Sequence, residues 1–166
     1  MAIAKGDVFR CGETATHAMQ DYALSISKRV KVAGSGGGHR RFVCKSEDCK
    51  FFVQLYQRKL NGKKLPTWYI SSLDLEHVNC TSVPKMTSRQ LRAEPVFRNA
   101  VLSNISATAP ELIARVQRMK SVLLPNSSIV YRSKNALTEG TAETQAQWYQ
   151  RIPSLLESFA AANPGS

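Results

Sequence analysis

The chain has 166 residues, of which 43% are hydrophobic, so it can bury the core of one ordinary domain or of two small ones. No stretch approaches the ~18 apolar residues of a membrane span, and the N-terminus lacks the apolar region of a secretory signal, which argues against a membrane partner and against secretion. The formal net charge of +11 predicts a surface that attracts polyanions, most commonly nucleic acid. A solvated basic surface without a partner is the alternative.

The first predicted element is an amphipathic helix over residues 13–27. Glu13 lies in its first turn, where the helix dipole favours an acidic side chain. Apolar residues recur at helical spacing along this stretch: Ala15, Ala18, Met19, Tyr22, Ala23 and Ile26. We therefore expect one short helix with a single buried face.

Extended segments follow the helix. Residues 29–32 alternate between basic and apolar side chains, the Gly34 to Gly38 run interrupts the pattern, and a second extended run ends at Cys44, which predicts a hairpin. Aromatic and β-branched residues mark two more strands on either side of a tight turn at Asn61-Gly62. The predicted strands of this small, four-stranded antiparallel sheet are 29–32, 41–44, 51–56 and 67–70.

Beyond Pro84 the strand pattern stops and helical spacing replaces it. After Pro110, one helical face collects Leu112, Ile113, Val116 and Met119. The predicted helices are 97–105, the stretch after Pro110, Asn126 or Ser127 to about Leu137, and about 142–162 with a kink at Pro153. The sequence thus predicts an α+β chain of two domains, residues 6–82 with the sheet and residues 85–162 with helices alone.

Four side chains at the ends of the predicted sheet have the spacing of a metal site. Four residues separate Cys44 from Cys49, and His77 and Cys80 follow the fourth predicted strand. Two such pairs can form a tetrahedral Cys3His zinc site, and because so small a sheet is barely stable alone, we expect zinc binding and folding to be coupled. The alternative is that Cys44 and Cys49 are buried thiols and His77 a surface residue. We expect the remaining cysteine, Cys11, to be a packing residue.

Together these residues resemble a known family of DNA-binding domains. The shared features are the N-terminal helix, the basic strand, the strand ending in Cys44, Cys49 followed by aromatics, Trp68-Tyr69-Ile70, and Glu76-His77 before Cys80. They are similar to the WRKY-GCM type of zinc finger in its Mutator-like transposase form, over about residues 6–81. The chain departs from the family in one respect, since two residues separate His77 from Cys80 where the family usually has one.

The C-terminal half also resembles these transposases. Tyr131-Arg132-Ser133-Lys134 and the final Asn163-Pro164-Gly165-Ser166 are similar to the helical segment that ends just before the family's catalytic domain. The resemblance implies recognition of transposon terminal inverted repeats or, in a derived transcription regulator, of promoters in the nucleus. We expect no enzymatic activity, because the acidic residues after Asp74 are too few and too scattered for the family's two-metal chemistry.

The resemblance also implies which residues contact double-stranded DNA. It places the strand over Lys28 to Ser35 edge-on in the major groove, where a β-ribbon fits. Arg29 and Arg40 are the preferred readers of guanine, because arginine can form two parallel hydrogen bonds with that base. Alternatively, the basic residues protect an exposed strand edge from aggregation. The expected DNA-binding residues here are Lys28, Arg29, Lys31, Ser35, His39, Arg40 and Arg41.

The predicted helices between Pro110 and Leu137 could form a helix-turn-helix, in which Arg132 and Lys134 face a second groove. The alternative is a helical bundle that forms a homodimer or packs on another domain. A different class of function for the whole chain is a protein–protein interaction module with structural zinc and incidental charge. Replacing the base-reading arginines separates the two classes, because only a DNA-binding module loses affinity for DNA.

Overall fold

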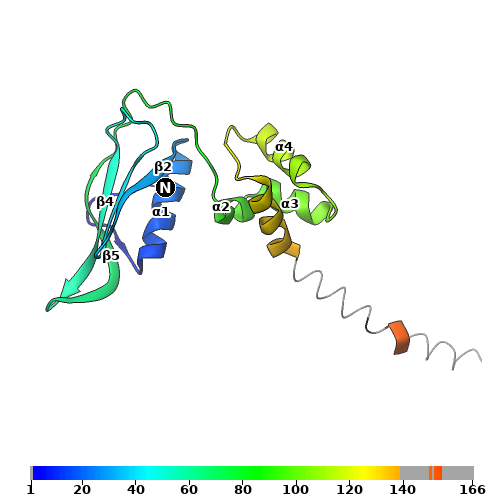
Figure 1. Cartoon of the computed structure of the whole chain (residues 1–166), viewed down its shortest axis with the longest axis horizontal. Helices are drawn as coiled ribbons and strands as arrows, with labels where there is room; N and C mark the ends of the chain where they lie inside the picture. The colour runs from blue at the N-terminus through cyan, green and yellow to red at the C-terminus, as the bar shows by residue number, and fades with distance from the viewer. Residues whose placement is uncertain (1, 139–149, 151, 155–166) are drawn as a thin grey trace, which may run out of the picture. The chain divides into compact units, whose positions relative to one another are not determined.

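The computed structural model describes residues 2–138, 150 and 152–154, and divides into two compact units (Figure 1). The sheet unit comprises the chain up to Gln90 together with Lys120–Pro125. The helical unit comprises Leu91–Met119 and the described residues from Asn126 onward. The helix expected over 142–162, with its kink at Pro153, lies largely outside the described residues. No helix in the described ranges is both long and apolar enough to span a membrane.

The predicted α+β class is confirmed, but the sheet has five strands instead of four. Their order is β1-β5-β4-β3-β2, and every pair is antiparallel. The additional strand has only two residues and pairs with β5, so it is too short to show alternation in the sequence. The strands are β1 (Val8–Phe9), β2 (Val30–Gly36), β3 (His39–Cys44), β4 (Phe52–Leu60) and β5 (Lys63–Asp74).

The glycine run does not end the first hairpin where the sequence suggested. β2 continues through it, with Gly34 opposite Arg41 and Gly36 opposite His39, because ladder hydrogen bonds need no side chain. The turn itself lies at Gly37 and Gly38, whose φ angles of 56° and 92° are in the left-handed region that glycine tolerates. The turn expected at Asn61-Gly62 is present, with φ of 49° and 77°.

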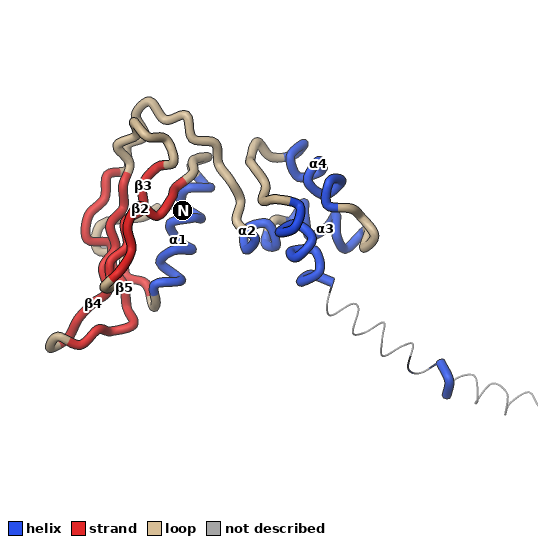
Figure 2. Tube along the Cα trace, viewed as in Figure 1, coloured by secondary structure: helices blue, strands red, loops and turns tan. Residues whose placement is uncertain are grey.

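The helix expected over 13–27 is α1 (Gly12–Ser25), and it lies along one face of the sheet (Figure 2). Its buried residues include Ala15, Met19 and Tyr22. The strand residues that complete this core alternate with residues of the opposite face, as period-two geometry requires. The core residues from the strands are Phe42, Cys44, Val53, Leu55, Trp68 and Ile70, with Phe51 from the loop before β4.

The order of helices after the sheet differs from the expected order. A short helix that the sequence did not reveal, α2 (Ser88–Ala93), precedes α3 (Pro95–Ser103), and α3 begins earlier than expected because proline suits the first helical position. α4 (Ala109–Met119) buries Leu112 and Val116 but leaves Met119 66% exposed. Residues 127–138 form a further helix, whose Val130 and Ser133 are buried.

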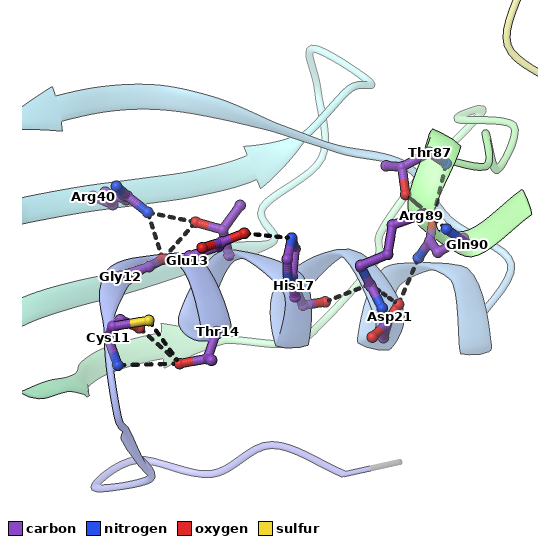
Figure 3. A network of polar contacts seen from close by, with 11 residues as sticks. Cys11, Gly12, Glu13, Thr14, His17, Asp21, Arg40, Thr87, Arg89 and Gln90 are labelled. Atoms are coloured by element: carbon purple, nitrogen blue, oxygen red, sulfur yellow. Dashed lines mark hydrogen bonds and ion pairs between the residues drawn. The ribbon is translucent and has the colours of Figure 1, made fainter. Parts of the chain in front are cut away.

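The segment that follows the sheet is fixed to the sheet unit at two places. Met86 donates its backbone N–H to Leu123, and Leu123 donates to Pro84, so Lys120–Pro125 returns beside residues 84–86. Asp21 of α1 accepts hydrogen bonds from Arg89 and from Gln90 Nε2, the latter at 2.8 Å (Figure 3). These contacts hold residues 84–90 against the sheet unit.

Candidate functional site

The four side chains with metal-site spacing meet at one end of the sheet. Cys44 is the last residue of β3, Cys49 lies in the loop that leads to β4, and His77 and Cys80 lie in the loop after β5. Their ligand atoms all lie within 4.8 Å of one another. Cys44 Sγ is 3.3 Å from Cys80 Sγ, and Cys49 Sγ is 3.2 Å from His77 Nδ1. Antiparallel pairing brings the two halves of the set together.

The donor set fits a single metal ion. Around an ion with metal–sulfur bonds of about 2.3 Å, tetrahedral ligand atoms lie roughly 3.5–4 Å apart, close to the separations found here. Three thiols and one imidazole suit soft or borderline transition metals. His77 also stacks on Phe51, with ring centroids 4.5 Å apart, and its Nε2 is buried without a hydrogen-bond partner among the described residues. Nδ1, which lies beside Cys49 Sγ, is the candidate ligand atom, and Nε2 would then carry the ring proton.

Ser82 is a neighbour of the site that the spacing did not reveal. Its hydroxyl lies 3.1 Å from Cys80 Sγ and 3.3 Å from Cys44 Sγ. Desolvation by burial raises the pKa of the Cys80 thiol, but hydrogen bonding from Ser82 outweighs this effect and lowers the pKa to about 6. At Cys49 desolvation dominates and raises the pKa to about 11. One thiol is therefore ready to ligate as a thiolate at neutral pH, and another must first lose a proton.

The loop that carries the last two ligands is tied to the beginning of β2. Lys28 Nζ donates to the carbonyl oxygen of Cys80 at 3.3 Å, and the backbone N–H of Arg29 donates to Ser82 Oγ at 3.4 Å. Lys45, just after Cys44, donates its N–H to the carbonyl of Arg29 at 2.8 Å. The position of the basic residues that lead into β2 thus depends on the metal loop.

The basic residues expected to bind DNA are divided between the two units. Lys31 and Ser35 are exposed on β2, the last strand of the sheet order, and Lys28 and Arg29 are half-buried just before it. Arg132 is exposed in the helical unit. These two groups belong to different units.

Arg40 is engaged inside the sheet unit. Its Nη1 donates to the carbonyl of Gly12 at 2.5 Å (Figure 3) and to Thr16 Oγ1 at 2.6 Å. Its guanidinium lies 5.0 Å from the ring centroid of Trp68. Arg40 and Arg41 are consecutive in β3, so they project to opposite faces. Through Nη1, Arg40 holds the first turn of α1 on the sheet.

Two other expected contacts also have internal partners. Lys134 donates Nζ to the carbonyl of Ala107 at 2.7 Å, which fixes the turn before α4 within the helical unit. His39 stacks at a tilt on Tyr56, with ring centroids 4.9 Å apart, on the sheet face opposite α1.

Cys11 precedes α1 and is half-buried, and its N–H donates to Thr14 Oγ1 at 3.1 Å, so its place is at the helix start (Figure 3).

Comparison of the chain with family models, with curated proteins and with solved structures gave no match.

Proposed function

We propose that this chain is a zinc-dependent module that binds double-stranded DNA in a sequence-specific manner. Zinc is the metal that best suits a closed tetrahedral set of three thiolates and one imidazole. β2 is the strand proposed to enter the major groove edge-on, with Arg29 just before it and Lys31 and Ser35, on its two faces, as the proposed contacts. Arg40 is left out of the proposed contacts because its guanidinium is bound within the sheet unit.

The observation that carries this proposal is the attachment to the metal loop of the basic residues Lys28 and Arg29, which lead directly into the edge strand β2. β2 has a neighbour on one side only, β3, so its other edge is open to a partner within the described sheet. The two residues just before it are held through Cys80 and Ser82. A metal at the Cys3His set would therefore fix the metal loop and position the strand. Loss of the metal would release the loop and the strand.

The biological setting follows from the resemblance to Mutator-like transposases. The proposed targets are transposon terminal inverted repeats or, in a derived transcription regulator, promoter sites in the nucleus. Arg132 is exposed and free to contact a second groove if 127–138 acts as a recognition helix. The alternative proposed role of the helical unit is homodimer formation.

The test is selection of bound sequences from random duplex DNA at about 150 mM salt, where purely electrostatic binding is weak. The full chain should enrich one motif when zinc is present, and a strong zinc chelator should abolish the enrichment. Arg29→Ala should weaken binding to that motif by about 1–3 kcal/mol, or roughly 5- to 150-fold. Arg10→Ala, which removes an equal charge from an exposed position outside the strands, is the matched control.

A protein–protein interaction module with structural zinc is the second candidate. A hollow of about 690 Å³ between α3 and α4, lined in part by Val96, Ala114, Arg115 and Met119, favours it, because apolar side chains with polar neighbours suit a protein partner. Retention of DNA without any enriched motif, unaffected by the chelator and equally reduced by Arg29→Ala and Arg10→Ala, would reject the DNA proposal and favour this one.

A further inference from the structure

The face of the sheet opposite α1 carries aromatic and basic side chains in ordered rows. Residues paired directly across antiparallel strands share a face, so the register assigns its members. One row crosses three strands as Tyr69, Tyr56 and His39. Phe52 lies on the same face of β4, four residues before Tyr56. α1 packs on the other face, so these rings lie outside the core.

Cations lie over these rings. The guanidinium carbon of Arg41 is 5.0 Å from the Phe52 ring centroid, and that of Arg58 is 6.0 Å from the Tyr69 centroid. Tyr56 is 39% exposed, and with Tyr69 and Arg58 it lines an open hollow of about 550 Å³. Within the described strands the only acidic residue is Asp74, whereas the basic ones are Lys31, Arg40, Arg41, Arg58, Lys59, Lys63 and Lys64.

We infer that this face binds single-stranded DNA, with bases stacked on Tyr56, Tyr69 and Phe52, and with Arg41 and Arg58 moving off the rings that they cover to meet the phosphates. A flat aromatic surface with flanking arginines is complementary to unpaired bases joined by anionic phosphates. Duplex DNA cannot use it in this way, because its bases are already stacked. The function of this face is thus distinct from that of the β2 edge.

The polar groups of the face favour DNA over RNA. Gln54 Nε2 donates to the Tyr56 hydroxyl at 3.2 Å and lies 3.0 Å from His39 Nε2, and Gln54 Oε1 accepts from Ser72 at 3.1 Å. These contacts occupy the Gln54 amide and the His39 ring nitrogen, so fewer polar groups remain for a ribose 2′-hydroxyl, the group by which proteins recognise RNA.

The experiment measures binding of the zinc-loaded full chain to a fluorescent oligothymidylate of about 15 nucleotides by anisotropy, at about 150 mM salt. Tyr56→Ala and Tyr69→Ala should each weaken binding roughly 5- to 150-fold, the range expected for loss of one base–aromatic stack. Tyr56→Phe keeps the ring and should stay within about twofold of the wild type. Leu102→Ala, an exposed apolar residue of α3, is the surface control.

Affinity for the duplex motif, measured on the same variants, separates this inference from the proposed function. Tyr56→Ala should lower strand affinity and leave duplex affinity unchanged, and Arg29→Ala should do the reverse. If Tyr56→Ala is poorly folded by circular dichroism, Arg58→Ala replaces it, since that side chain is exposed. Equal strand affinity of the alanine variants and the wild type, or tighter binding to an oligouridylate than to the oligothymidylate, would overturn the inference.

Discussion

Replacement of Arg40 with alanine should destabilise the sheet unit without removing a DNA contact. The variant loses two hydrogen bonds from a charged donor, to Gly12 and Thr16, and the contact with Trp68. A charged hydrogen bond contributes about 1.5–3 kcal/mol and a partly desolvated cation–π contact about 1–2 kcal/mol. These contributions are not additive, because the three contacts share one side chain and solvent replaces part of them. We expect a total loss of about 2–4 kcal/mol in the free energy of unfolding.

The assay compares Arg40→Ala with Arg29→Ala in urea unfolding of the zinc-loaded chain and in binding to the selected duplex. Arg40→Ala should lower the unfolding midpoint and, at a temperature where it remains folded, should bind the duplex within about threefold of the wild type. Arg29→Ala should show the opposite pattern. Wild-type stability of Arg40→Ala combined with a tenfold or greater loss of duplex affinity, roughly 1.4 kcal/mol, would refute the internal role inferred from the contacts.

Two further predictions concern the metal site and the helix start. Ser82→Ala removes a hydrogen bond that lowers the pKa of Cys80 to about 6, so this pKa should rise and the thiol should become protonated near neutral pH. Zinc must then displace an additional proton, so the slope of log zinc affinity against pH should steepen by up to about one between roughly pH 6 and 8. Competition with a chromophoric chelator measures this affinity, and equal slopes for the variant and the wild type would contradict the prediction. A Cβ at Gly12 would lie 3.0 Å from Trp68 Cε2, so Gly12→Ala should cost about 1–2 kcal/mol in urea unfolding, and an equally stable variant would show that the ring can shift.

The sequence was most informative where a local pattern has a single structural meaning. The spacing of Cys44, Cys49, His77 and Cys80 predicted a cluster that the structure assembles, because ligands at both ends of a meander meet when its strands pair. The helical spacing of apolar residues over 13–27 predicted α1, because residues three or four positions apart share one face of a helix. Both features depend on residues close in sequence or on simple antiparallel pairing.

The sequence was least informative where long-range pairing decides the role of a side chain. Arg40 and Arg41 look equivalent in the sequence, but the register sends one to α1 and the other to the open face. The pairing of Asp21 with Arg89 joins residues 68 positions apart and has no local signal. The period-two rule could have separated Arg40 from Arg41, because Phe42 and Cys44 are core residues and Arg40 shares their face.

The hairpin of β4 and β5 carries a cost that a polyanion would offset. Lys59 lies directly opposite Lys64 in the register, and Lys63 follows at the turn. Like charges facing each other across a strand pair are destabilising, and the sequence between Phe52 and Ser72 offers no acidic side chain to compensate. Phosphates bound beside Arg58 would reduce this repulsion, so binding to the open face should raise the stability of the hairpin as well as use its aromatic rings. The same lysines then contribute to strand binding through charge, and their contribution should fall with salt while that of Tyr56 should not.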